Sequence, residues 1–164
     1  MPRVADLRYA LRGPRPTLVI RGAVLVHFDR HRQRTRADTE AGGQIFATYE
    51  PETITICRAT GPYATDDRRR CLFTPDRSRE DRDLRRWFRK KQHFLGNWHT
   101  HPEAIPRPSR VDVRNTRQRF RESDHPLLAF TMIIVGTNDF PEGLWVSLIN
   151  DVGHTQLHPV PKPH

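Results

Sequence analysis

Two histidines one residue apart, His99 and His101, are the residues whose types and spacing most directly indicate chemistry. On a β-strand they would project from the same face, because strand side chains alternate between faces. Trp98 and Thr100 would then face the opposite side, where Trp98 would anchor the strand in the core. Pro102 should end the strand, since proline cannot donate a backbone hydrogen bond. The pair could hold a metal ion, although histidines at this spacing are more often solvated or packed in a core.

A carboxylate that could complete a metal site follows shortly after the histidines. Ser109 and Asp112 form an S-x-x-D pattern where a helix is expected to begin, and this pattern is also a common capping arrangement with no catalytic role. Both roles are compatible, because a helix start would hold Asp112 rigidly. Two histidines and one aspartate leave a fourth position for water, as catalytic zinc sites require. The spacing therefore predicts a Zn²⁺ site made by His99, His101 and Asp112.

Glu40 is the candidate for the group that works on the bound water. It precedes two glycines and an apolar stretch, and without the histidine motif we would interpret it as an exposed loop acid. Zinc lowers the pKa of a bound water to about 7, and a carboxylate can take its proton and deliver it to a leaving amine. We expect Glu40 to be this general acid–base, and the Ser109 hydroxyl to stabilise the developing oxyanion.

Hydrophobic periodicity and turn signals predict the elements that must position these residues. We expect an N-terminal arm over residues 1–16, either poorly ordered or an interaction segment, a domain over 17–158 and a frayed proline-rich tail over 159–164. Helices are expected over residues 23–33, 78–92 and 109–122, and strands over 17–21, 44–49, 53–59, 93–101, 130–136, 144–149 and 155–158. Residues 61–75, with glycine, proline and clustered charges, indicate a long connection.

The upstream glutamate, H-x-H-P, and an S-x-x-D separated from His101 by the seven residues 102–108 together resemble the JAMM metalloprotease family, over roughly residues 17–150. The resemblance implies an α/β fold, a single MPN/JAB domain of the cytidine-deaminase-like α/β/α sandwich type around a curved mixed β-sheet. It also implies a zinc peptidase that cleaves a peptide or isopeptide bond after the C-terminus of a ubiquitin-like protein. In that scheme Glu40 and Ser109 are the catalytic residues.

Within the family, the chain is most similar to bacterial stand-alone members encoded beside ubiquitin-activating and conjugating-like enzymes. Some of these belong to CBASS antiphage operons, where the peptidase frees a nucleotidyltransferase from the proteins it was joined to. The expected partner is then a ubiquitin-like protein or its conjugate. Another bacterial branch processes sulfur-carrier proteins, and the sequence does not choose between the two. A RadC-like DNA-associated protein and a catalytically silent MPN scaffold are further alternatives. The first usually has a glycine soon after H-x-H-P, where this chain has Glu103 and Ala104, and the second lacks zinc ligands.

The net charge of +9 comes mainly from arginine and favours acidic partners, although an arginine-rich genome would explain it equally well. Nucleic acid stays an open but not favoured partner, and residues 68–70 and 85–91 are candidates for guiding an acidic substrate face. Cys57 and Cys71 form no disulfide framework, which indicates a reduced, cytoplasmic setting. The sequence has no apolar signal core and no stretch long enough to cross a bilayer, so no membrane partner is expected.

Overall fold

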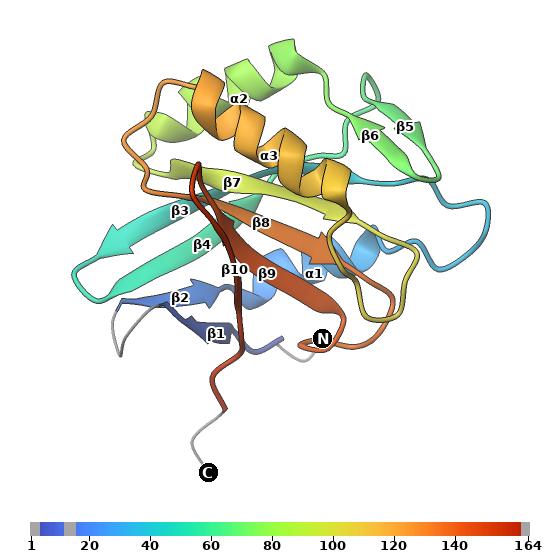
Figure 1. Ribbon diagram of the computed structural model, residues 1–164, viewed down its shortest axis with the longest axis horizontal. Coiled ribbons are helices and arrows are strands. Elements are labelled where there is room, and N and C mark those ends of the chain that lie inside the picture. Colours follow the sequence, from blue (N-terminus) through green and yellow to red (C-terminus); the bar gives the residue numbers. More distant parts are fainter. Residues whose placement is uncertain (1–3, 12–15, 162–164) are drawn as a thin grey trace.

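The structure is a computed structural model that describes residues 4–11 and 16–161. Within these ranges an eight-stranded mixed sheet, in the order β1-β2-β4-β3-β7-β8-β9-β10, is accompanied by three helices and a separate hairpin (Figure 1). The strands of the main sheet are β1 (Leu7–Ala10), β2 (Thr17–Ile20), β3 (Gly42–Glu50), β4 (Thr53–Ala59), β7 (His93–Thr100), β8 (Phe130–Val135), β9 (Leu144–Ile149) and β10 (His154–Leu157). The helices are α1 (Gly22–Arg30), α2 (Arg77–Phe88) and α3 (Arg110–Glu122), and the hairpin pairs β5 (Asp67–Arg69) with β6 (Leu72–Thr74).

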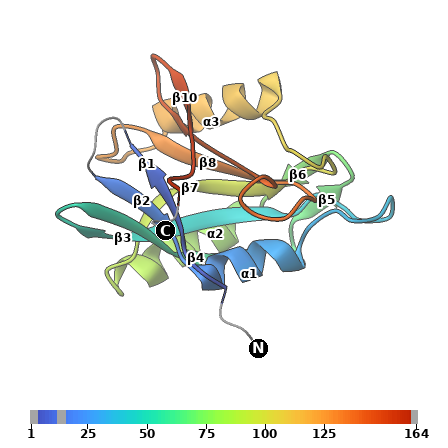
Figure 2. The same cartoon turned by 90° about the horizontal axis from the view of Figure 1, so that it is seen from below.

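Helices cover both faces of the sheet, and Figure 2 shows α1 and α3 on opposite sides of it. The central strand β8 is a continuous apolar run with all six residues buried, as expected for a strand covered on both faces. Its residues Ile133 and Val135 join the main hydrophobic core on the α1 side. Met132 and Ile134 form a smaller cluster on the other side, against Val113 of α3. The sheet therefore separates a large apolar core from a thinner layer beneath α3.

The expected α/β fold, with a curved mixed sheet between helices, is confirmed. The predicted helices and the strands of the main sheet are present, with boundaries shifted by a few residues. The helix expected over 78–92 ends earlier, at Phe88, and the chain then turns through Lys91, which has a φ of 58°. No helix in the described part of the chain is long and apolar enough to cross a membrane.

Two segments expected to lack secondary structure contain strands. In the arm, β1 pairs antiparallel with β2 and buries Tyr9, which is 1% exposed, so the expectation of a poorly ordered arm is wrong for residues 7–10. The first residues of the tail are also attached, because the Val160 N–H donates to the carbonyl of Arg8. The same expectations also cover residues 1–3, 12–15 and 162–164, which lie outside the described residues. The expected long connection over 61–75 contains the β5–β6 hairpin. The charged residues of β5 have no strand pattern in the sequence.

Candidate metal centre

His99, His101 and Asp112 come together where β7 ends and α3 begins. The two histidine Nε2 atoms are 3.2 Å apart. Asp112 Oδ1 lies 3.4 Å from Nε2 of His99, and Asp112 Oδ2 lies 3.3 Å from Nε2 of His101. The three side chains are only 14%, 13% and 17% exposed, respectively. The structure therefore brings the three predicted ligands into one compact, half-buried group of donor atoms.

The spacing of these donor atoms fits zinc. Four ligands about 2.0–2.1 Å from a tetrahedral zinc ion lie about 3.3–3.4 Å from one another. Here the two Nε2 atoms are 3.2 Å apart, and each lies 3.3–3.4 Å from one of the two Asp112 oxygens. Two imidazole nitrogens and a carboxylate are also a donor set that zinc prefers. Nδ1 of His101 is buried without a hydrogen-bond partner among the described residues, and Glu103 Oε1 lies 3.5 Å from it. A carboxylate beside the second nitrogen of a ligating histidine typically orients the ring.

Charge complementarity holds the group together. Burial by itself would raise the pKa of Asp112, but hydrogen bonds from His101 and His99 outweigh it and hold the pKa well below its usual range. Burial would lower the pKa of His101, whereas the hydrogen bond and negative charge of Asp112 raise it. Asp112 is therefore ionised, as a metal ligand must be.

The beginning of α3 fixes Asp112 through reciprocal capping. The Ser109 N–H donates to Asp112 Oδ2 over 2.7 Å, and the Asp112 N–H donates to Ser109 Oγ over 3.0 Å. The predicted capping box is thus confirmed, and it immobilises the carboxylate that faces the two histidines. Ser109 is exposed, and because its oxygen only accepts in the cap, its hydroxyl proton stays available to a ligand.

Glu40 lies just before β3 and is 8% exposed. The hairpin holds its backbone: the Glu40 N–H donates to the Arg69 carbonyl over 2.7 Å, and Arg68 Nε donates to the Glu40 carbonyl over 2.8 Å. Burial raises the pKa of the Glu40 carboxyl, against the opposing charges of His99 and His101. Glu40 is thus a buried carboxylate within the electrostatic reach of the predicted ligands.

The two glycines after Glu40 are required by close backbone approach. Gly42 pairs with His99 and Gly43 with Trp98, so β3 begins beside the strand that carries the histidines. A Cβ at Gly43 would stand 1.8 Å from the carbonyl oxygen of Thr60, and one at Gly42 would stand 2.8 Å from the Phe73 ring of β6. Larger residues would therefore push apart the elements that surround Glu40.

A buried hydrogen-bond network behind the histidines ties the two halves of the site together. Thr100, which is fully buried, donates through Oγ1 to Gln33 Oε1 over 2.9 Å and accepts from the Ala41 N–H over 2.9 Å. The Thr100 N–H also donates to the Ala41 carbonyl over 2.8 Å. Ala41 follows Glu40 in the chain, and Thr100 separates the two histidines. The network thus sets the position of Glu40 relative to His99 and His101.

Gln33 and Thr100 are neighbours of the candidate site that the sequence did not indicate. Gln33 is 2% exposed, and its Nε2 also donates to the Arg70 carbonyl of the hairpin over 2.8 Å. The signal available in the sequence was a polar residue, Thr100, at a strand position expected to face the core. The sequence assigned a guiding role to residues 68–70, but in the structure Arg68 and the Arg70 carbonyl hold the backbone around Glu40.

Comparisons with known proteins agree with this geometry. Residues 24–147 match the family model described as prokaryotic homologs of the JAB domain. A Pseudomonas aeruginosa protein named "CD-NTase/cGAS isopeptidase" is 35% identical over 136 residues, which is 80% of this chain and 82% of the relative. A Vibrio cholerae protein of the same name is 29% identical, covering 75% of this chain and 78% of the relative. A solution structure from Desulfitobacterium hafniense shares the fold, with a TM-score of 0.57 at 18% identity over 84% of this chain and 87% of that one. The chain therefore belongs to the prokaryotic JAB-domain family.

Proposed function

We propose that this chain is a zinc-dependent isopeptidase that cleaves after the C-terminus of a ubiquitin-like protein or its conjugate, and that its substrate in antiphage defence is a conjugated CD-NTase. The observation that carries this proposal is the triangle of His99, His101 and Asp112 donor atoms, with the buried Glu40 nearby. Relatives in Pseudomonas aeruginosa, Vibrio cholerae and Escherichia coli named "CD-NTase/cGAS isopeptidase" support the choice of substrate.

His99, His101 and Asp112 would hold the zinc ion. When bound there, zinc supplies a Lewis acid that lowers the pKa of water and polarises a carbonyl. Glu40 accepts a proton from the attacking water and later donates it to the departing amine. Burial raises the pKa of this carboxyl, which suits a group that must both accept and release a proton near neutral pH. The exposed Ser109 hydroxyl donates to the carbonyl oxygen as negative charge develops on it.

The hairpin provides an edge on which the substrate tail can bind. β5 and β6 pair with each other in a two-stranded sheet, and on its other side β5 contacts the segment of Glu40. Among the described residues, no backbone hydrogen bond reaches the outer edge of β6, residues Leu72–Thr74. An extended C-terminal tail can add to this edge as a third strand, so that its last peptide bond reaches the site between Glu40 and the predicted ligands.

The test is cleavage of a defined fusion. A CD-NTase is joined through its C-terminus to a reporter protein, and mass spectrometry identifies the product. We expect a single cut after the last CD-NTase residue, abolished by a chelator, restored by zinc and insensitive to thiol-blocking reagents. A sulfur-carrier fusion and duplex or single-stranded DNA are compared in parallel across a salt series. Tight DNA binding without cleavage of any fusion would instead support a RadC-like role.

A further inference from the structure

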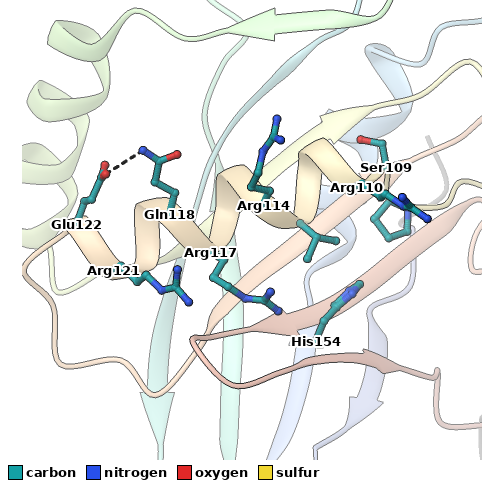
Figure 3. A pocket seen from close by; sticks show the side chains of 10 residues that line it. Ser109, Arg110, Arg114, Arg117, Gln118, Arg121, Glu122 and His154 are labelled. Carbon is teal, nitrogen blue, oxygen red and sulfur yellow. Dashed lines mark hydrogen bonds between the residues drawn. The ribbon is translucent and has the colours of Figure 1, made fainter.

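A cleft lined by arginines begins at Ser109 and extends along α3 away from the candidate metal centre. It has a volume of about 830 Å³ and lies between α3 and the residue His154 of β10. Four arginines of α3, spaced by four, three and four residues, line it: Arg110, Arg114, Arg117 and Arg121. Figure 3 shows Arg117 and Arg121 reaching toward β10, whereas Arg114 points away from it. We call this surface the arginine cleft.

The four arginines differ in whether their side chains bind other residues of the protein. Arg117 Nε donates to the carbonyl of Asn150 over 3.0 Å, and Arg121 pairs with Asp151, so both fasten α3 to the turn between β9 and β10. The side chains of Arg110 and Arg114, the two nearest the candidate metal centre, have no hydrogen bond or ion pair within the described residues. Unpaired positive charge is therefore concentrated at the end of the cleft that adjoins Ser109.

Little in the cleft opposes an incoming anion. Among the described residues that line the cleft, Glu122 is the one carboxylate. It lies at the end away from Ser109 and accepts a hydrogen bond of 2.8 Å from Gln118 Nε2. On the opposite wall, Nε2 of His154 is buried without a hydrogen-bond partner in the described part of the chain. The cleft thus presents free guanidinium groups, which suits a ligand with carboxylates.

The position of the cleft indicates which part of a conjugate would occupy it. In Figures 1 and 2 the β5–β6 hairpin and β10 lie on opposite sides of the beginning of α3. If the tail of the conjugated protein binds along β6, the chain on the other side of the scissile bond must leave across Ser109 and along α3. That chain belongs to the acceptor polypeptide, whose amine departs in the reaction.

The dimensions suit an extended polypeptide. α3 has 13 residues, so at about 1.5 Å per residue it is about 20 Å long, room for about six residues of extended chain. Arg110 and Arg114 are one helical turn apart, about 6 Å along the axis. Side chains at alternate positions of an extended chain are about 6.6 Å apart. The spacing of the two free arginines along the helix axis therefore matches that of acidic side chains at alternate positions of an extended chain.

The lining of the cleft favours a peptide over nucleic acid. Proteins that bind single-stranded nucleic acid combine positive charge with aromatic side chains on which bases stack. No phenylalanine, tyrosine or tryptophan is among the described residues that line this cleft. We propose, resting on the proposed isopeptidase function, that the arginine cleft binds an acidic, extended segment of the acceptor polypeptide and thereby selects which conjugates are cleaved.

The first test measures binding, which does not depend on cleavage. Fluorescence anisotropy compares a labelled peptide with glutamate at alternate positions, a serine-substituted peptide, and a single-stranded oligonucleotide of equal net charge. Arg114→Glu is the test variant. Arg82→Glu is the matched control, because Arg82 is an exposed arginine on α2 outside the cleft and the substitution changes net charge equally. We expect the acidic peptide to bind wild type and Arg82→Glu alike, to bind Arg114→Glu about fivefold to tenfold more weakly, and to dissociate as salt rises.

The second test measures selection during cleavage. Two fusions carry either the acidic or the serine sequence immediately after the scissile bond, and kcat/KM is measured for each. Wild type and Arg82→Glu should prefer the acidic fusion about fivefold to tenfold, and Arg114→Glu should lose this preference. Equal weakening of peptide binding by both variants, or tighter Arg114-dependent binding of the oligonucleotide, would overturn the proposal. Arg114-dependent peptide binding with neither fusion cut would refute the cleavage activity and leave the acidic ligand of the cleft supported.

Discussion

On β7, Trp98 and Thr100 point toward α1, whereas His99 and the following His101 point toward α3. The α1 side is dry: Trp98 is 1% exposed and packs on Phe28, and Thr100 is fully buried and hydrogen-bonded. The α3 side has a small apolar cluster and two histidine side chains that are 14% and 13% exposed. One backbone thus joins a rigid, well-packed face to a polar face that remains open to ligands.

This division shows how a polar site can be held in place without a large core of its own. The core on the α1 side holds the β7 backbone in place. Because side chains alternate between the two faces of a strand, the backbone in turn determines where His99 and His101 project on the other face. The same face also fixes Glu40, because Thr100 binds both the N–H and the carbonyl of Ala41. Changes on the α3 side should therefore affect chemistry, while changes on the α1 side should affect positioning and stability.

The largest expected effect comes from removing a ligand on the α3 side. We expect purified wild type to contain about one zinc per chain, and Asp112→Ala to lose both metal and detectable cleavage. The loss follows because this carboxylate faces both imidazoles and is the one acidic member of the donor group. Metal analysis by mass spectrometry, together with the fusion assay, measures both. The control Asp81→Ala removes an exposed acid of α2 and should keep metal and activity. Wild-type protein without zinc, never exposed to chelator, would contradict the assignment.

A smaller effect should separate chemistry from metal binding. Glu40→Gln keeps the size of the side chain but cannot accept a proton, so zinc should stay bound while kcat falls about 100- to 10,000-fold. The measurement is the cleavage rate at saturating fusion together with metal content. Glu50→Gln and Glu52→Gln are matched controls, because these acids lie at the far end of β3 and in the turn after it. Wild-type turnover by Glu40→Gln would show that the general base is another residue.

The sequence was sufficient for the parts of the site that are local in the chain. The alternation around His99 and His101, and the capping of Asp112 by Ser109, depend on residues within a few positions of one another. The apolar run of β8 likewise identifies a strand covered on both faces. Such features could be predicted because neighbouring residues determine them.

The parts that could not be predicted depend on contacts between distant residues. Thr100 meets Gln33 across 67 positions and Ala41 across 59, and no local pattern reports either contact. The hairpin was missed because Asp67, Arg68 and Arg69 are indistinguishable in sequence from a charged loop. Its strands form where Arg68 and the carbonyl of Arg69 bind the backbone of Glu40, which a single sequence does not show.

A third prediction tests the α1 side as the positioning side. Thr100→Val keeps the shape of the side chain but leaves Gln33 Oε1 and the Ala41 N–H without their partner, which should cost about 1–3 kcal/mol of unfolding free energy. Because Ala41 adjoins Glu40, we also expect kcat to fall by about tenfold for a misplaced catalytic group, with KM and zinc content unchanged. Denaturant unfolding, metal analysis and steady-state kinetics distinguish these effects. Thr100→Ser should restore kcat, and a stability loss without any change in kcat would limit Thr100 to a structural role.

The smallest expected effect concerns pH and the dryness of the α1 side. Burial lowers the pKa of His31 to about 4, helped by the positive charges of His27, Arg68 and Arg30. His31 lies beside the ring of Trp98, behind the strand of the histidine pair. In the unfolded chain its pKa returns to about 6.5, so below that pH the unfolded state binds a proton that the folded state does not. Unfolding free energy should therefore decrease as pH falls from about 6.5 to about 4, and change little through this group above that range. His31→Gln, which does not titrate, should flatten this part of the stability profile in denaturant unfolding measured at several pH values. An unchanged slope in His31→Gln would show that another group carries this part of the pH dependence.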